Sequence, residues 1–285
     1  MLRSAREVVR DTLRGLGKDD VIGEAAKIAF FLTLSFFPIL LAVMSLTGIV
    51  GGAAAFEAIM SGIRGAMPPE AAAYVQQFVE EVVLEDHPQA LSIGLLLLLW
   101  TGSMALFQMA DSLNVMYGLQ QRKSMIVRRL YAMAVLLVGT LLLLLGVAIL
   151  LAGPAVTDYF GLDPVWELLQ WPLAIALLLS VLSFYLYALP NRRKSVRWRG
   201  VFVGAALGAL LLVLATLGIR LYIAVVGGMA AVYGALGAAI IMILWLFAAA
   251  ISILAGAKLA AVIEARLGAR VLENAGDSRR VEAQR

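Results

Sequence analysis

Hydrophobic residues are concentrated in six long stretches of the chain. A helix needs about 20 mostly apolar residues to cross roughly 30 Å of bilayer hydrocarbon. The stretches lie at 28–50, 91–110, 130–153, 171–189, 201–226 and 232–262. They predict an all-α, polytopic membrane protein with six transmembrane helices. Because the linkers are short, we expect one domain over residues 1–265, followed by a disordered cytoplasmic tail over 266–285.

The charges between these stretches predict the orientation. Every Lys and Arg except Arg64, Arg220 and Lys258 lies before the first stretch, between the second and third, between the fourth and fifth, or after the sixth. Six spans place these four segments on one side, and positive charge marks the cytoplasmic side. We therefore expect a multi-pass membrane protein with both termini in the cytoplasm. Topology accounts for the basic residues, so no nucleic-acid partner is expected.

Two segments outside the spans are predicted to be amphipathic helices. Residues 2–16 carry arginines on one face and apolar residues on another, which is typical of a helix lying among lipid headgroups. This helix is interpreted as an orienting anchor, with a gate or a docking site for a partner as the alternative. The first outer loop, 51–90, contains Pro68-Pro69 followed by a helical repeat of apolar residues. It predicts short helices over the outer mouth of the bundle.

The amino-acid composition limits the kinds of catalytic and metal site that the chain can form. The chain is 62% hydrophobic and only 15% charged, has no cysteine, and contains a single histidine, His87. Thiolate and histidine-based metal centres are therefore not expected, and no cofactor is predicted. No phosphate-binding loop or hydrolase motif occurs. We accordingly expect a protein that is not an enzyme and has no ATPase of its own.

Polar residues inside the stretches are candidates for a substrate pathway. Pro38 interrupts the first stretch, with Ser35 nearby to satisfy a freed backbone group; it marks either a substrate site or a simple kink. Arg220 lies near the outer end of the fifth stretch and is either functional or extended toward headgroups. The remaining candidates lie toward the cytoplasmic side: Gln108, Asp111 and Asn114 on one helical face, and Lys258. Depth alone suggests that Asp111 and Lys258 form an ion pair.

Small residues predict where helices pack closely. Gly200, Gly204 and Gly208 repeat every four residues in the fifth stretch, and Gly256 lies in a similar series in the sixth. Such spacing lets helix backbones approach each other in a membrane. We expect these two helices to pack together, either within one chain or across a dimer.

Several of these motifs resemble the YihY/BrkB family of bacterial inner-membrane proteins, once labelled ribonuclease BN. The matching pieces are Ala29–Pro38, Trp100–Asn114 with Tyr117-Gly118, Leu189-Pro190-Asn191, Trp198, Tyr222, Tyr233–Gly237 and Trp245. The resemblance covers most of residues 20–265 and implies a six-span inner-membrane protein. It also implies links to envelope integrity and to export of lipids or solutes. The chain departs from the family at Lys258, where the family often has glutamate.

Two functions are consistent with these features. The first is a transporter or flippase-like carrier of a lipid or another amphipathic molecule, with membrane lipids as its partners. The second is a structural or regulatory scaffold for envelope integrity, whose partner would be a second copy of the chain or an envelope protein. A ribonuclease is not expected, because the lone histidine lies in an outer loop and RNA hydrolysis needs acid–base pairs or bound metal.

Overall fold

The structure is a computed structural model. It describes residues 2–50, 57, 60–65, 67–82, 88–120, 124–160, 163–191, 198–226 and 235–283. His87 and the Tyr233-Gly234 piece of the resemblance lie outside these residues. Within the described ranges the chain is helical and has no strand, which confirms the all-α prediction.

The helices follow the predicted order. They are α1 (Leu2–Lys18), α2 (Val21–Val50), α4 (Pro69–Val82), α5 (Pro88–Met116), α6 (Met125–Phe160), α7 (Asp163–Ala188), α8 (Trp198–Val226) and α10 (Ala235–Ala283). Helix α1 confirms the predicted N-terminal helix. Helix α4 confirms a helix in the first outer loop, and it begins at Pro69 because proline fits the first helical position, where no amide donor is needed.

Among the residues that the structure describes, four helices contain apolar runs long enough to cross a membrane. These runs are Met125–Gly146 in α6, Leu168–Ala188 in α7, Trp198–Val225 in α8 and Gly237–Leu267 in α10. The stretches at 28–50 and 91–110 form helices α2 and α5, and as membrane spans they stay predictions. The chain is thus a multi-pass helical protein, while the count of six spans and the orientation remain expectations.

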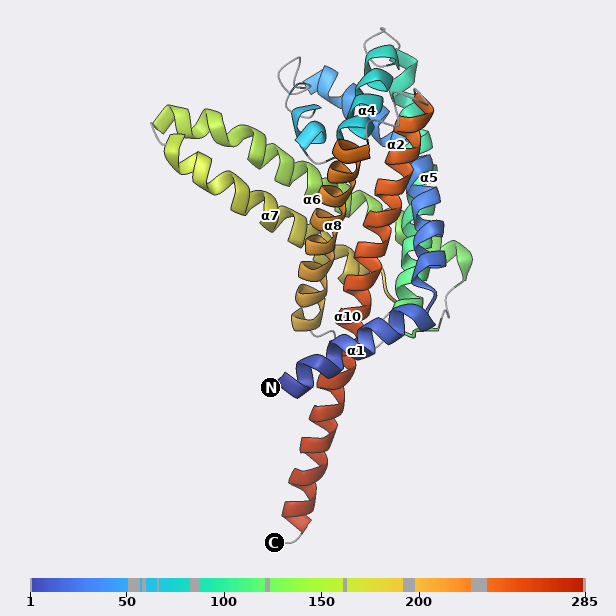
Figure 1. The fold of residues 1–285 in the computed structure, drawn as a ribbon, viewed down its shortest axis with the longest axis vertical. Coiled ribbons are helices and arrows are strands. Elements are labelled where there is room, and N and C mark those ends of the chain that lie inside the picture. The colour runs from blue at the N-terminus through green and yellow to red at the C-terminus, as the bar shows by residue number, and fades with distance from the viewer. Residues whose placement is uncertain are drawn as a thin grey trace.

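Helix α10 continues well beyond the bundle, which differs from the predicted disordered tail. It runs unbroken to Ala283, and its C-terminal part projects past α1 (Figure 1). The residues after 266 include alanine, arginine, glutamate and leucine, which are good helix formers, and they contain no proline. The composition of this tail is therefore compatible with a continuous helix.

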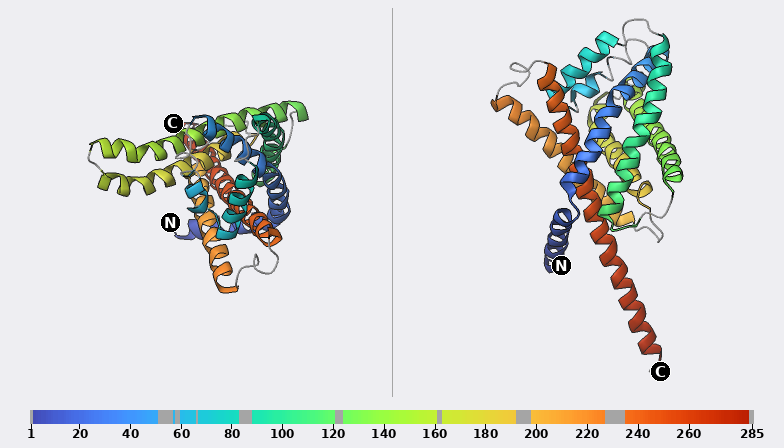
Figure 2. Two further views of the ribbon diagram at one scale, coloured as in Figure 1. Left: turned by 90° about the horizontal axis from the view of Figure 1, so that it is seen from above. Right: turned by 90° about the vertical axis from the view of Figure 1, so that its right-hand side faces the viewer.

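Helix α10 is the central element of the bundle. It packs against α8 and α2, while α5 packs on the other side of α2. Helix α4 contacts the N-terminal part of α10, and α1 contacts its middle part (Figure 1). Helices α6 and α7 form a hairpin that leans away from the other helices, as the view from above shows (Figure 2). This hairpin is attached to the rest of the bundle by contacts of α6 with α5 and of α7 with α8.

In the part of the chain that the structure describes, two hydrophobic clusters hold the bundle together. The larger one joins α2, α5, α6, α7, α8 and α10, with Ile28, Leu113 and Leu254 fully buried. The second packs α4 on the upper part of α10, where Val75 and Ile241 are almost inaccessible. Each cluster lies between helices that are far apart in sequence, so burial fixes the arrangement of the bundle.

The contact between α8 and α10 is made directly by glycines. The backbones of Gly204 and Gly256 lie against each other, so that a β-carbon on Gly204 would be 2.5 Å from the Gly256 carbonyl oxygen. One turn away, a β-carbon on Gly208 would be 3.2 Å from the Ser252 carbonyl oxygen. Gly200 lies against the side chain of Glu264. The predicted small-residue faces therefore meet within a single chain.

Candidate functional site

An apolar groove lies between α2 and α10 on the side of the bundle. It has a volume of about 500 Å³ and is lined by Ala26, Ala29, Phe30, Thr33, Leu34, Ile243 and Phe247. Phe30 is 64% exposed and Leu34 is 48% exposed, so the groove opens laterally rather than toward the bundle interior. A surface of this chemistry is stable in contact with hydrocarbon and unfavourable in contact with water.

The helix that forms one wall of this groove has a weakened backbone. Pro38 has no amide hydrogen, so it cannot donate to the carbonyl of Leu34, four residues earlier. The Thr33 hydroxyl donates to the Ala29 carbonyl at 2.8 Å, and the Ser35 hydroxyl donates to the Phe31 carbonyl at 2.7 Å. Hydroxyl bonds of this kind bend helices. The groove wall therefore coincides with a segment of α2 that can bend.

The candidates Ser35 and Pro38 do not line the groove themselves. Ser35 is 1% exposed, and Pro38 is also buried, so both lie behind the groove within the bundle. The groove residues of α2 that lie nearest to Pro38 are Thr33 and Leu34, about one turn before it. A role for Pro38 in a pathway would thus be conformational rather than through contact with substrate.

A polar pocket of about 150 Å³ lies on the predicted cytoplasmic side, between α5, α6 and the end of α7. Asn114 contributes both of its polar atoms: its amide nitrogen donates to the Ala110 carbonyl at 2.6 Å, and its oxygen accepts from the Asn191 amide at 2.7 Å. The Tyr131 hydroxyl donates to the Ala188 carbonyl at 2.7 Å. Asn114 thereby fixes the segment at which Pro190 follows the end of α7.

The predicted ion pair between Asp111 and Lys258 is wrong, because each residue pairs with a different partner. Arg128 on α6 binds Asp111, and its guanidinium lies 4.4 Å from the centre of the Phe107 ring. Lys258 binds Asp19, at the corner between α1 and α2, and donates to the Met116 carbonyl at 3.0 Å.

Arg220 binds backbone rather than a side chain. It donates to the Met67 carbonyl at 2.9 Å and to the Arg64 carbonyl at 3.4 Å, and it also binds the Gly65 carbonyl. These carbonyls end a helical segment at 60–65 and lead into α4. A cation is favourable at the C-terminus of a helix, where carbonyl groups lack partners. Arg220 therefore tethers the segment before α4 to α8, an arrangement that sequence depth alone did not suggest.

A buried acid that the sequence analysis missed links α2 to α5. Glu24 is 9% exposed; it accepts a hydrogen bond from the Ser112 hydroxyl at 2.6 Å and pairs with Lys27 at 2.6 Å. The Gln108 amide donates to the same Ser112 hydroxyl at 3.4 Å. Glu24 lies just before the first stretch, where it resembles an ordinary flanking charge, so its position gave no signal of burial.

The seven pathway candidates consequently do not form one site. Asn114 lines the polar pocket, Asp111 binds the pocket residue Arg128, and Gln108 belongs to the link with α2. Arg220 lies at the opposite end of the bundle, close to α4. Within the described residues, no group of three or more His, Asp and Glu side chains is placed to hold a metal ion.

Comparison with known proteins identifies relatives across most of the chain. A protein of Bacillus subtilis (strain 168) that is called ribonuclease-like, YfkH, is 26% identical over 85% of this chain and 90% of its own length. A UPF0761 membrane protein of Rhodospirillum centenum is 27% identical over 73% of this chain and 45% of its own length. Another, from Ralstonia nicotianae, is 25% identical over 90% of this chain and 59% of its own length.

The chain therefore spans only about half the length of these two UPF0761 proteins. No solved structure matches it. A family model described as "Virulence factor BrkB" matches residues 12–280, which is nearly the whole chain. This match agrees with the resemblance seen in the sequence motifs, and we conclude that the chain is a membrane protein of the BrkB family.

Proposed function

We propose that the protein is a carrier that moves a lipid, or another amphipathic molecule, along the groove between α2 and α10. The observation that supports this proposal is the coincidence of two features. The groove of about 500 Å³ is apolar and opens laterally, and one of its walls is the segment of α2 that Pro38 weakens. A hydrocarbon chain suits such a groove, and bending of α2 would change its width.

The source of energy follows from what the chain contains. No ATP-binding motif occurs in the sequence, so the carrier would use the substrate's own gradient, an ion gradient or a partner protein. The three charged pathway candidates are engaged with protein groups: Asp111 with Arg128, Lys258 with Asp19, and Arg220 with backbone carbonyls. This favours passive or partner-driven movement over transport driven by these charges.

Movement of a fluorescent phospholipid across proteoliposomes tests the proposal. We expect the purified protein to accelerate exchange between leaflets above the rate in protein-free vesicles. Ala26→Trp should slow this exchange, because Ala26 is exposed and lines the groove, which a large ring would fill. Pro38→Ala should also slow it by restoring the hydrogen bond that stiffens α2.

The matched control is Ala134→Trp, at an exposed alanine on α6 that does not line the groove. This variant adds the same side chain to the lipid-facing surface and should exchange lipid at the wild-type rate. Equal rates for the Ala26→Trp and Ala134→Trp variants would contradict a pathway through the groove. Wild-type protein that moves no lipid above protein-free vesicles would refute the carrier.

The second candidate function is a non-transporting scaffold for the bacterial envelope. It is favoured by the direct packing of Gly204 on Gly256 and by the tether of Arg220 to the segment before α4, since both make the bundle rigid. Its partner would be a second copy of the chain or an envelope protein. A wild-type protein that moves no lipid but is captured by cross-linking in one defined complex in cells would support the scaffold.

A further inference from the structure

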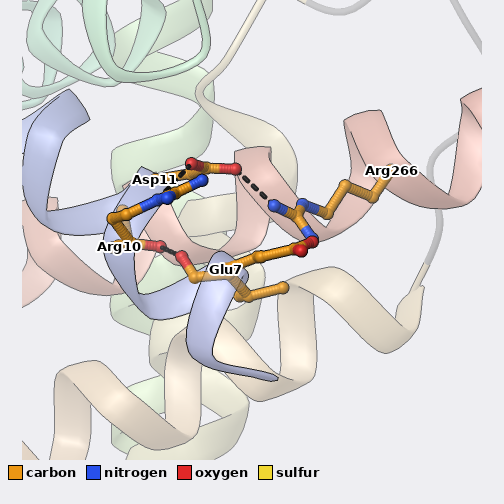
Figure 3. Close-up of polar contacts among 6 residues, drawn as sticks. Glu7, Arg10, Asp11 and Arg266 are labelled. Atoms are coloured by element: carbon orange, nitrogen blue, oxygen red, sulfur yellow. Dashed lines mark hydrogen bonds and ion pairs between the residues drawn. The ribbon is translucent and has the colours of Figure 1, made fainter. Parts of the chain in front are cut away.

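One flank of α1 binds α10 through acidic side chains. Arg266 pairs with Asp11 and, at 3.3 Å, with Glu7, and both acids come from α1 (Figure 3). Arg10 of α1 also approaches Asp11, at 3.9 Å. The hydrogen bond from Arg266 keeps the pKa of Asp11 below its ordinary value, so this carboxylate is ionised at neutral pH. The acidic flank of α1 is therefore engaged with protein.

The opposite flank of α1 is apolar and basic. Val9 is 56% exposed and Leu13 is 64% exposed, although both are large hydrophobic side chains. Together with Arg6, Arg10 and Arg14 they line a shallow apolar depression on the surface. Residues 9 and 13 are four apart, and 6, 10 and 14 are also four apart, so each set forms a stripe along the helix.

Contacts at two places along α1 fix which flank faces away from the protein. Near its C-terminal end, Gly15 lies against the Lys258 side chain so closely that a β-carbon would collide with it. Lys258 also binds Asp19, just beyond α1. In the middle of α1, Arg266 holds Glu7 and Asp11, and Arg266 lies two turns beyond Lys258 along α10. Because α1 is attached at two levels, it cannot rotate to bury Val9 and Leu13 in the protein.

We propose that the flank formed by Arg6, Val9, Arg10, Leu13 and Arg14 is a binding surface for an anionic lipid leaflet. The apolar run of α10 ends at Leu267, next to Arg266, so α1 lies at the level where hydrocarbon gives way to headgroups. At that level Val9 and Leu13 enter the edge of the hydrocarbon, and the arginines meet lipid phosphates and anionic headgroups. The ion pairs with Arg266 hold this surface in a fixed position relative to α10. The lipid composition of the leaflet therefore affects the position of α10.

Site-directed fluorescence on the full-length chain tests this proposal. The chain has no cysteine, so a single introduced cysteine carries an environment-sensitive dye without background labelling. The probe position is Leu13→Cys. The control is Lys18→Cys, which is exposed on the acidic side of the same helix. Each labelled protein is placed in nanodiscs of phosphatidylcholine alone or with phosphatidylglycerol, and nitroxide-labelled lipids serve as quenchers.

We expect the dye at residue 13 to shift to shorter wavelength and to be quenched more strongly in the anionic nanodiscs, while the dye at residue 18 responds little. An arginine near an anionic surface changes binding by roughly fivefold. Changing Arg6, Arg10 and Arg14 together to glutamine should therefore abolish the difference between the two lipids. A circular dichroism spectrum of this triple variant shows whether α1 remains helical.

Two outcomes would overturn the proposal. Equal quenching of the dye at residue 13 in the two kinds of nanodisc would show that charge has no part in the binding. No quenching of this dye in either kind of nanodisc would show that the flank faces water. A second variant tests the orientation independently. Glu7→Gln combined with Asp11→Asn removes the pairs with Arg266, and the dyes at residues 13 and 18 should then respond alike. Unchanged contrast between the two positions would show that these pairs do not orient α1.

Discussion

Replacing Gly204 by alanine tests whether backbone contact holds α8 against α10. A β-carbon at this position would lie 2.5 Å from the Gly256 carbonyl oxygen and 2.7 Å from the β-carbon of Ala260. Favourable contacts between such atoms need roughly 3.5–4 Å. The obstructing atoms belong to the backbone or to the first atom of a side chain, so no flexible group can move aside. The two helices would have to separate.

Gly218 provides a matched comparison within the same helix. It also lies inside α8, but a β-carbon there would meet no atom within 4 Å. Alanine is favoured over glycine in a helix by about 1 kcal/mol, and both variants share this gain. Only Gly204→Ala adds the cost of overpacking, which is about 1–3 kcal/mol. We therefore expect its free energy of unfolding to fall below that of Gly218→Ala by about 1–3 kcal/mol.

Unfolding in mixed micelles with increasing dodecyl sulfate, followed by circular dichroism, measures this difference. The Gly218→Ala variant should be at least as stable as the wild type. The Gly256→Ala variant should behave like the Gly204→Ala variant, because its β-carbon would meet the Gly204 carbonyl oxygen. If the Gly204→Ala and Gly218→Ala variants were equally stable, the reasoning from close packing of α8 and α10 would be refuted.

Three further predictions follow from single contacts. Asp19→Asn and Lys258→Met should be coupled by about 0.5–3 kcal/mol in a double-mutant cycle of unfolding, and additive effects would contradict their ion pair. Asn114→Ala should lower the free energy of unfolding by about 0.5–1.5 kcal/mol, measured in the same micelles, because the partly buried Asn191 amide loses its hydrogen-bond acceptor. The pKa of Asp11 is lowered by its hydrogen bond from Arg266, so its contribution to the docking of α1 is complete above about pH 4 and is lost as the pH falls through the lowered pKa. A spin label on α1 should therefore become more mobile in acid, and Asp11→Asn should be mobile at every pH.

The helical elements could be predicted because each rests on a local pattern. Length and apolar content determine where long helices form, and the arginine spacing of residues 2–16 determines a surface helix. Proline at the first position of a helix marks the start of α4 at Pro69. The continuation of α10 to Ala283 could not be predicted as readily, since a charged sequence of good helix formers is compatible with either a helix or a disordered tail.

Contacts between helices could be predicted only where they depend on spacing. The glycine series identified the faces of α8 and α10 that meet, because close approach requires small residues at regular intervals. The partners of Asp111 and Lys258 could not be found in this way. Sequence gives the depth of a charge along a helix, but the rotation of each helix decides which charge it meets. Arg128 and Asp19 are the actual partners because α6 and the corner after α1 face those positions.

The two sides of the groove belong to differently anchored parts of the bundle. Helix α10 is fixed to α8 by glycine contacts and to α1 by the pairs with Arg266, whereas the lower part of α2 is fixed to α5 through Glu24 and Ser112. Widening of the groove would thus be concentrated in the upper part of α2, beyond these anchors and near Pro38. This gives Pro38→Ala its diagnostic value. A carrier should lose activity when α2 is stiffened, while a scaffold, which needs no such motion, should assemble with its partner as before.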